Sequence, residues 1–291
     1  MQNPPSEMKS RCLSLPNVTL CAVDTRTPAL AIRSLTLSMK AVEFAETILF
    51  TSEHHKLKHI PLGIRIVPIP ELQSIQDYSL FVLLKLGNYV QSTHALISQW
   101  DGYVTTPSAW RAEFLEFDYI GAPWPKAPND QSVGNGGFSL RSKRLLQATA
   151  SPKFKISHPE DLSICQHNRS FLAQAGLRVA PPDIAIQFSQ ERVGASFESF
   201  GFHGAFHLMR FTDAEELAQL IDDLPPHMTR SLELKELAKR LIQSREAKHL
   251  EIARTLIAKR FSSGLRDTRQ WKLWLRLQWA QWRKIQFIAK R

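Results

Sequence analysis

The sequence predicts an α/β fold, in which a mostly parallel sheet is flanked by helices and followed by an all-helical C-terminal extension. Three observations support this. Short apolar runs alternate with helical patterns through the first half of the chain. From Thr212 onward the apolar spacing is helical throughout. Hydrophobic residues make up 43% of the 291 residues and charged residues 22%, an ordinary globular composition.

The first strand is expected at Val18–Val23, where a β-branched apolar run ends at Asp24. Thr27 followed by Pro28 is typical of a helix start, so a helix should run to about Ala41. Further strands are expected at 46–51, 64–69, 94–100 and 138–140, with helices from Asp77 through Leu86, at 144–150 and at 162–172. The C-terminal helices are expected at 213–223, 232–260 and 269–290.

The charge distribution divides the chain. Residues 1–229 contain 20 lysines and arginines against 22 aspartates and glutamates, whereas residues 230–291 contain 17 against 5. We expect an N-terminal extension at 1–16, a domain at 17–210 that contains the candidate catalytic residues described below, and a basic helical region at 211–291. Because the core has no basic stripe, no nucleic-acid partner is expected.

Cysteine usage and hydropathy indicate where the protein works. The three cysteines show no CxxC spacing, which argues against a zinc site or a disulfide framework and for a reducing compartment. The longest apolar stretch, Leu80–Leu84, is too short to cross a bilayer. We expect a cytoplasmic protein, with a peripheral position on the inner face of the cytoplasmic membrane as an option.

Two carboxylates should lie at the carboxyl ends of strands, where ligands of such sheets collect. Asp24 follows the first strand, and Asp101 follows the strand that ends at Trp100. A carboxylate at position 101 can hold a divalent cation that bridges diphosphate oxygens. The alternative is a turn aspartate that caps the next segment.

The run Gly134–Ser139 has three glycines in four positions. It lacks the Lys-Ser/Thr ending of an ATP-binding loop, but it permits positive φ angles and a close approach of backbone N–H groups to a ligand. A tight turn before a strand is the alternative. Arg141, just beyond it, can pair with phosphate.

Glu160 and Asp161 follow Pro159 and either supply a general base or stabilise the first turn of a helix. His203 lies between Gly201 and Gly204 and is a candidate metal or phosphate ligand. The alternative is a structural role, which is the more common one for a histidine.

Four motifs together resemble one family, which is known as a domain of unknown function and is grouped with GT-A-type glycosyltransferases. They are QWDGY at 99–103, FDYIGAPW at 117–124, VGNGGFSLR at 133–141 and FGFHG at 200–204. The resemblance covers roughly residues 17–210. It implies a GT-A-like sheet and a transferase that moves a sugar from a nucleotide-sugar donor to a glycan or lipid-linked acceptor, with inversion, in surface polysaccharide or glycoconjugate synthesis.

The resemblance also implies roles for individual residues. Asp101 and His203 match the metal site for Mn²⁺ or Mg²⁺, and Asp161, with Glu160 beside it, matches the catalytic base. The sequence departs from the family at Gln99, which replaces the first carboxylate of the Asp-x-Asp motif. The donor-binding residues implied are Asp24, Thr25, Asp101, Gly136, Gly137 and Arg141; the acceptor-binding residues are Asn135 and Trp124.

The C-terminal segment is expected to form an amphipathic helix that carries four of the seven tryptophans. One face would contain Trp271, Trp274, Leu275, Trp282, Ile285 and Ala289, and another Lys272, Arg276, Arg283 and Lys290. Tryptophan beside basic residues suits an anionic membrane surface. Packing of the aromatic face on the catalytic domain is the alternative.

Two rival functions remain open from sequence. A nucleotidyltransferase can use a similar sheet, but it usually needs a glycine-rich loop after the first strand, and residues 24–27 contain no glycine. The second rival is a catalytically inactive, membrane-docked scaffold or sugar-binding protein, which the glutamine at position 99 favours.

Overall fold

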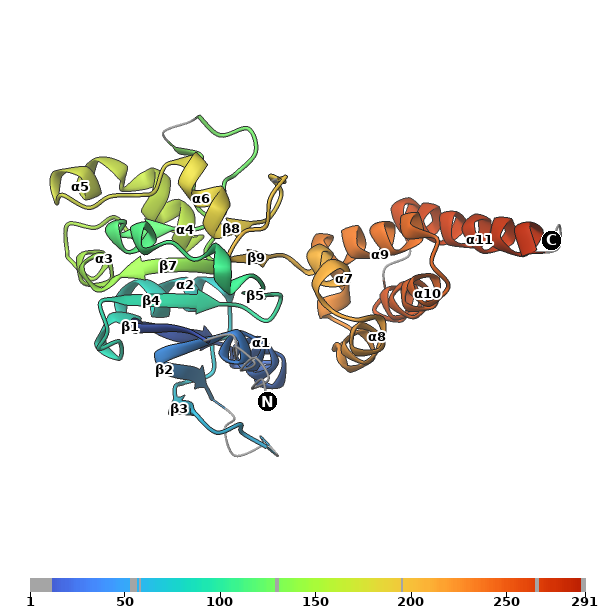
Figure 1. Ribbon diagram of the computed structural model, residues 1–291, viewed down its shortest axis with the longest axis horizontal. Coiled ribbons are helices and arrows are strands. Elements are labelled where there is room, and N and C mark those ends of the chain that lie inside the picture. The colour runs from blue at the N-terminus through green and yellow to red at the C-terminus, as the bar shows by residue number, and fades with distance from the viewer. Residues whose placement is uncertain are drawn as a thin grey trace, which may run out of the picture. The chain divides into compact units, whose positions relative to one another are not determined.

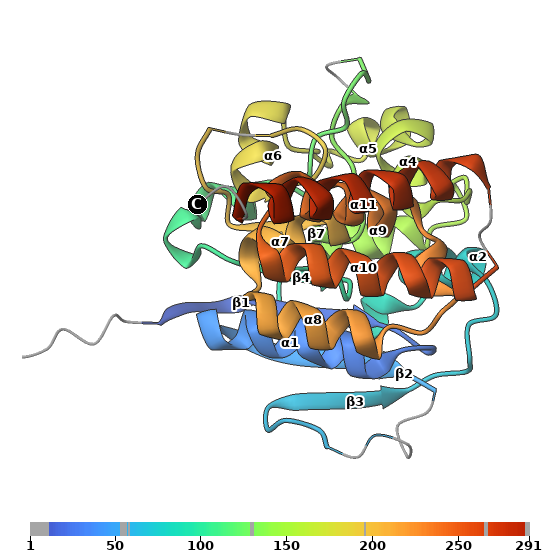
Figure 2. The same ribbon diagram turned by 90° about the vertical axis from the view of Figure 1, so that its right-hand side faces the viewer.

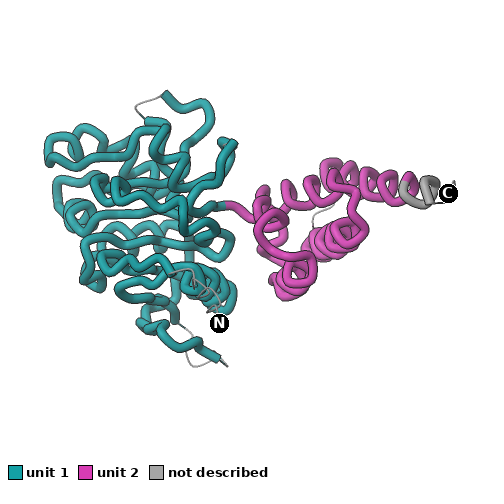
Figure 3. Tube along the Cα trace, in the orientation of Figure 1, with its two compact units in different colours: residues 1–203 teal, residues 204–291 magenta. Residues whose placement is uncertain are grey.

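A computed structural model describes residues 12–52, 57, 59–128, 131–194, 196–264 and 267–288, with side chains at the C-terminal end described as far as Arg283. The chain forms two compact units, residues 1–203 and 204–291 (Figure 3). The first unit contains the sheets, and the second is all helical (Figure 1). The expected fold class, a mostly parallel α/β sheet with a C-terminal helical part, is confirmed.

The main sheet has six strands in the order β3-β2-β1-β4-β7-β6. Strands β1 to β4 are mutually parallel neighbours, whereas β7 runs antiparallel to both β4 and β6. A second sheet has the order β5-β9-β8. The bounds are β1 Leu13–Val23, β2 Val42–Thr51, β3 Ile64–Pro68, β4 His94–Ser98, β5 Gly102–Val104, β6 Tyr119–Ile120, β7 Phe138–Ser142, β8 Ser189–Gln190 and β9 Gly201–His203.

Strand β1 begins at Leu13, inside the stretch expected to be an extension. Residues 13–15 pair with residues 42–44 of β2, and a register irregularity then separates them from the main run of pairs. This extra pairing lengthens both strands at their start, so β2 follows directly from the first helix. The sequence pattern misses it because Pro16 and Asn17 interrupt the apolar run.

Helices cover both faces of the main sheet. Helix α1 (Pro28–Ala41) packs in one apolar cluster with alternate residues of the central strands, and α2 (Ile75–Leu84) and α3 (Lys143–Thr149) pack in the cluster on the other face. Burial on both faces explains the continuous buried runs at 18–22 in β1, at 47–51 in β2 and throughout β4. The remaining helices of this unit are α4 Glu160–Leu162, α5 Arg169–Gln174 and α6 Pro182–Phe188.

The start of α2 differs from the expectation that Asp77 caps it. Ser74 is the N-cap: its Oγ accepts from the Asp77 N–H at 3.1 Å, while Asp77 Oδ2 accepts from the Ser74 N–H at 2.9 Å. This reciprocal pair is a capping box, in which the acidic residue stands three positions inside the helix. The helix expected at 162–172 is also interrupted, by a π-helical turn at Ser163–His167.

The strand order reverses between β1 and β4, because β2 and β3 lie on one side of β1 and β4 on the other. The carboxyl ends of these parallel strands meet at one edge of the sheet. Such a reversal leaves a crevice in which ligands of α/β sheets bind. Asp24 follows β1 and Asp101 follows β4, so both residues lie at this edge.

The helical unit contains α7 Leu208–Phe211, α8 Ala214–Asp223, α9 Leu232–Ser244, α10 Ala247–Ser262 and α11 Thr268–Ile288. Helix α10 packs against α8, α9 and α11 (Figure 2). The single helix expected at 232–260 is wrong, because Arg245 adopts a left-handed conformation with φ 59° and ends α9. Glycine or asparagine usually marks such a break, so an arginine there gives no sequence signal.

Helix α11 packs an aliphatic face within this unit. Leu273, Leu277 and Ala280 are buried, and α11 contacts α9 and α10. Among the described helices, none is long and apolar enough to cross a membrane.

Candidate functional site

A pocket of about 370 Å³ opens where several predicted segments meet. A larger pocket, of about 610 Å³, lies beside α5 and α6 but contains none of the predicted site residues. The smaller pocket is therefore the candidate site. Its lining residues are Ile75, Tyr78, Gln99, Trp124, Asn135, Gly136, Gly137, Pro159, Glu160, Asp161, Glu191, Arg192 and His203.

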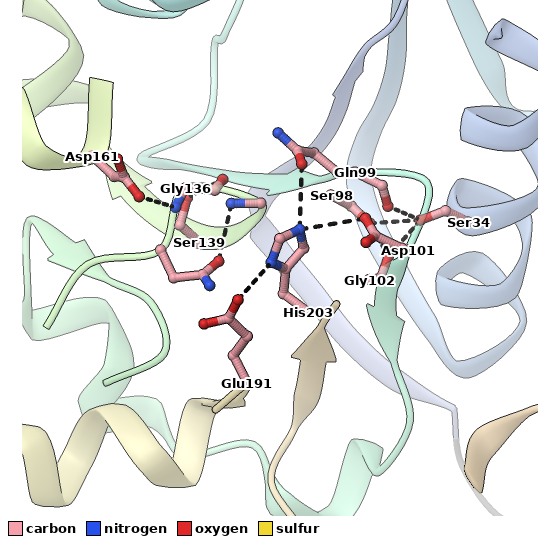
Figure 4. A network of polar contacts seen from close by, with 12 residues as sticks. Ser34, Ser98, Gln99, Asp101, Gly102, Gly136, Ser139, Asp161, Glu191 and His203 are labelled. Carbon is pink, nitrogen blue, oxygen red and sulfur yellow. Dashed lines mark hydrogen bonds and ion pairs between the residues drawn. The ribbon is translucent and has the colours of Figure 1, made fainter. Parts of the chain in front are cut away.

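His203 lies at the centre of the polar network in this pocket (Figure 4). Its Nε2 is 3.3 Å from Asp101 Oδ1 and 3.3 Å from Gln99 Oε1, and its Nδ1 is 3.9 Å from Glu191 Oε1. Two oxygens that can only accept face Nε2, so in this arrangement the Nε2 proton donates to them. Asp101 therefore contacts His203 from behind the pocket wall, while Gln99 lines the pocket itself.

Two buried serines hold the turn that carries Gln99 and Asp101. Ser34 of α1 lies 2.9 Å from the Gln99 carbonyl and 2.5 Å from the Gly102 carbonyl, and Ser98 Oγ donates to that same Gly102 carbonyl at 2.7 Å (Figure 4). The Gln99 N–H donates to the Gly137 carbonyl at 2.8 Å. Helix α1 and the glycine-rich loop therefore fix this turn from two sides.

The glycine-rich loop interlocks with the large side chains of the site. A Cβ added to Gly137 would lie 2.1 Å from His203 Nε2, and one added to Gly136 would lie 2.0 Å from Glu160 Oε1. Gly134 makes the same kind of room for the Trp124 ring. The expectation of positive φ angles at these glycines is wrong: the loop's positive φ, 60°, belongs to Asn135. These glycines are required instead because large side chains approach the loop backbone closely.

Glu160 and Asp161, although adjacent, face different surroundings. Glu160 is buried, and its Oε1 accepts from Arg141 Nη2 at 2.9 Å. Asp161 is half-buried, and its Oδ2 accepts from the Gly136 N–H at 3.2 Å, which anchors the loop (Figure 4). Because the Glu160 carboxylate neutralises a buried guanidinium, Asp161 is the member of the pair that suits proton transfer.

Arg141 is fully buried and does not line the pocket, which removes it from the expected donor-binding residues. Besides Glu160 it contacts Ser139 Oγ at 3.1 Å, and its guanidinium lies over the Tyr119 ring at 5.2 Å. Burial by itself would lower the pKa of Arg141, but Tyr119, Glu160 and Tyr78 outweigh it and the net pKa is raised. Arg141 is thus a permanent buried cation paired with Glu160, a lining residue of the pocket.

Tyr78 is a pocket residue that the sequence analysis did not select. Burial raises the pKa of its phenol, and the nearby Glu160 carboxylate raises it further, so the group stays neutral. Gln99 Nε2 donates to its hydroxyl oxygen at 3.2 Å. Tyr78 therefore orients the Gln99 amide so that its oxygen points at His203.

Asp24 and Thr25, expected near the donor, have other partners. Asp24 Oδ1 accepts from the N–H groups of Arg26 and Thr27 at 2.8 and 2.7 Å. Thr25 Oγ1 accepts from the Leu72 N–H at 3.1 Å. Neither residue lines the pocket. Asp24 shapes the loop between β1 and α1, which is the usual role of an aspartate after a strand.

Glu191 and Arg192, which follow β8, are further pocket residues that sequence reasoning missed. They complete the wall on the Nδ1 side of His203, and Arg192 Nε lies 3.8 Å from Glu191 Oε1. No motif surrounds them in the sequence. The only available signal was topological, since β8 pairs with the strand that carries His203.

The fit of a cation can be tested on the donor atoms present. Among the described residues, no group of three or more His, Cys, Asp or Glu side chains is arranged to hold a metal ion. Asp101 Oδ1 and Gln99 Oε1, a carboxylate and an amide oxygen, nevertheless each lie 3.3 Å from the imidazole Nε2 of His203. Adjacent ligands around Mg²⁺ are separated by about 3 Å, so the spacing fits a site with one charged ligand.

Comparison with known proteins gives a family match and likenesses to solved structures. Residues 62–203 match the family model described as "Protein of unknown function (DUF5672)". No match is found among the curated proteins. Among solved structures, the chain is similar to the mannosyltransferase PcManGT from Pyrobaculum calidifontis in complex with GDP-Man and Mn²⁺. That likeness has 15% identity and a TM-score of 0.38, and it covers 90% of this chain and 80% of that chain.

The family match covers every lining residue of the pocket, from Ile75 to His203. It leaves β1, β2 and the helical unit outside.

Proposed function

We propose that this protein is a glycosyltransferase of GT-A type that uses a nucleotide-sugar donor. The observation that carries the proposal is convergence. Gln99, the loop at 135–137, Asp161 and His203 are far apart in the sequence but line one pocket at the strand-order reversal of the sheet. The pocket has the size for a sugar and a diphosphate. The motif resemblance adds the expectation of a nucleotide sugar.

The diphosphate of the donor would lie against Gln99 and His203, which line the pocket, with Asp101 behind His203. Because Asp101 would be the single carboxylate ligand beside His203 Nε2, a divalent cation would take its remaining ligands from the diphosphate oxygens and water. When bound, the cation neutralises charge on the departing diphosphate. Asp101, His203 and Gln99 would hold it, with His203 binding through Nε2 as a neutral imidazole whose proton lies on Nδ1, the nitrogen that faces Glu191.

Asp161 would act as the general base. Its carboxylate takes the proton of the acceptor hydroxyl while that oxygen attacks the anomeric carbon of the sugar. The bond from this carbon to the diphosphate breaks, and its electron pair leaves with the diphosphate. One displacement of this kind inverts the configuration. The hydrogen bond from the Gly136 N–H holds Asp161 in place, and each carboxylate oxygen keeps a second lone pair for the proton.

The acceptor would enter past Trp124 and Asn135, which line the same pocket. We propose a glycan or lipid-linked acceptor in surface polysaccharide or glycoconjugate synthesis, used at the inner face of the cytoplasmic membrane. The Trp124 ring suits this side because sugar rings stack on indole faces through their C–H groups.

The test is product analysis with a panel of nucleotide sugars, including donor hydrolysis without acceptor. Asp161→Asn should bind donor normally and lower turnover about a hundred-fold or more. Asp222→Asn, on an exposed part of α8, is the matched control and should turn over normally. Glu191→Gln removes the other pocket carboxylate that is not committed to Arg141. If Glu191→Gln abolishes turnover and Asp161→Asn does not, the base is assigned to the wrong residue.

The proposed cation has its own readout. Mn²⁺ titration followed by electron paramagnetic resonance should show weak binding to the protein alone and binding at least about tenfold tighter when a nucleoside diphosphate is present. His203→Ala should remove this gain. Turnover that is unaffected by a chelator would overturn the cation and leave Asp101 as a structural partner of His203.

A further inference from the structure

Helix α11 has two apolar faces on opposite sides. The aliphatic face, Leu273, Leu277 and Ala280, is buried within the helical unit. The opposite face, which we call the tryptophan face, consists of Trp271, Leu275, Trp279 and Trp282, and these side chains are 50%, 57%, 53% and 57% exposed. Their spacing of four, four and three residues places them in one row along the helix.

This row differs from the face expected from the sequence. Trp279 belongs to it, whereas Trp274 is only 37% exposed and lies to one side, with its ring against Trp271. The side chain of Ile285 and residues Ala289 and Lys290, which were also expected on these faces, lie outside the described residues. The structure thus assigns the buried packing of α11 to leucines and leaves the large aromatic surface exposed.

A basic row lies beside the tryptophan face. Lys272, Arg276 and Arg283 are exposed and follow the aromatic row around the helix. The Arg283 guanidinium lies over the Trp279 ring, 4.1 Å from its centre. The sequence from Thr268 to Arg291 contains no aspartate or glutamate. Apolar surface and positive charge are therefore presented by the same side of one helix.

We propose that the tryptophan face of α11 binds the surface of an anionic lipid bilayer, with the helix lying in the plane of the interface. Indole rings and an aliphatic side chain enter the boundary between headgroups and acyl chains, and the neighbouring cations bind lipid phosphates. The positive charge of α11 favours an anionic lipid surface over a second copy of the chain as the binding partner. A second copy of the chain would bring the same cations to the interface, and like charges oppose that contact. This inference does not depend on the transferase assignment.

The test is co-sedimentation of the full chain with vesicles. The vesicles contain phosphatidylcholine alone or with about one third phosphatidylglycerol. Binding should require the anionic lipid, fall with added salt, and shift tryptophan emission to shorter wavelength. Trp279→Gln/Trp282→Gln and Arg276→Gln/Arg283→Gln should each lower the partition coefficient about tenfold or more. Glutamine keeps the helix propensity and already occupies neighbouring positions of α11.

Two controls match these variants within the same unit. Leu232→Gln changes an exposed apolar residue at the start of α9, and Arg254→Gln changes an exposed cation on α10. Both should sediment like the wild type, and all variants should keep the wild-type circular dichroism. Equal sedimentation of the two α11 variants and the wild type overturns the proposal. So does a dimer in size-exclusion chromatography that the tryptophan variant dissociates, because the occupant is then a second copy.

Discussion

The glycine-rich loop and helix α11 place large side chains in opposite ways. Around the loop, three glycines admit Trp124, Glu160 and His203 so closely that a Cβ would collide with each. Along α11 three tryptophans point away from the packed leucines. In the loop, the side chains that pack against the glycines are also those proposed for binding and catalysis, so a change there affects both stability and activity. In α11, the face that stabilises the helix and the face available for binding are separate, so the two properties can be changed independently.

The largest effect should come from the ion pair under the loop. Glu160→Gln leaves the Arg141 guanidinium fully buried without its counter-charge, so the free energy of unfolding should fall by about 3–5 kcal/mol. Chemical denaturation with urea measures it. Asp161→Asn, one residue away and half-buried, should change stability by less than about 1 kcal/mol.

A double replacement separates charge from packing at this position. Arg141→Met/Glu160→Met removes both charges and should recover most of the stability lost by Glu160→Gln. Equal losses from Glu160→Gln and Asp161→Asn would show that the two carboxylates do not have the separate roles that their surroundings imply.

How far the sequence predicts this region depends on what each motif encodes. Strand ends and the loop glycines are local features, so the sequence places Asp101 at the carboxyl edge of the sheet and Gly136 in a loop before a strand. The role expected for Asp161 comes from the motif resemblance. Which carboxylate is neutralised depends on Arg141, nineteen residues away in the chain from Glu160, and only tertiary packing reveals that pair. Glu191 has no local signature at all, because its place in the pocket follows from the pairing of β8 with β9.

The second prediction tests the separation of faces in α11. Leu277→Ala removes a buried side chain and should destabilise the helical unit by about 2–5 kcal/mol. Leu275→Ala, two residues away and 57% exposed, should cost less than about 0.5 kcal/mol. Thermal unfolding followed by circular dichroism compares them. Similar losses in the two variants would mean that the tryptophan face is also covered in solution.

For this helix the sequence predicts the element but not its orientation. The spacing of tryptophans and of leucines is equally regular, and each set defines an apolar face of its own. Periodicity cannot choose between two such faces. The choice depends on tertiary packing: α11 contacts α9 and α10, and its buried side chains are Leu273, Leu277 and Ala280.

The third prediction concerns the contact between the loop and the histidine. Gly137→Ala places a methyl group 2.1 Å from His203 Nε2, so the imidazole must move away from Asp101 and Gln99. We expect a loss of about 1–3 kcal/mol in stability and at least a tenfold loss of turnover. Gly194→Ala, which would meet no atom within 4 Å, is the matched control.

A double-mutant cycle of Gly137→Ala with His203→Ala identifies the cause of this loss of stability. In His203→Ala the space beside Gly137 is free, so adding Gly137→Ala to it should cost much less stability than it does in the wild type. Additive losses would mean that the methyl group disturbs the loop itself rather than the imidazole.

The smallest effect expected is a pH dependence of the stability of the sheet unit, caused by His94. His94 begins β4, the strand that leads to Asp101, and it is buried, with Nε2 3.3 Å from the Phe117 carbonyl. Burial lowers the pKa of His94 below its usual range, and the carbonyl and Asp118 only partly oppose this. The unfolded chain therefore binds a proton that the folded chain resists. Stability is complete above the unfolded pKa of about 6.5 and declines as the pH falls through it toward the folded pKa.

His94→Gln should remove that decline, because the glutamine amide can still donate to the Phe117 carbonyl but does not titrate. Unfolding free energies measured from pH 7.5 to 5 should show an uptake of about one proton or less in the wild type, and a smaller uptake in the variant. Lys85→Gln, an exposed change after α2, is the control for altered net charge. Identical pH profiles in the wild type and His94→Gln would assign the acid sensitivity to the carboxylates, and the start of β4 would then contribute packing alone.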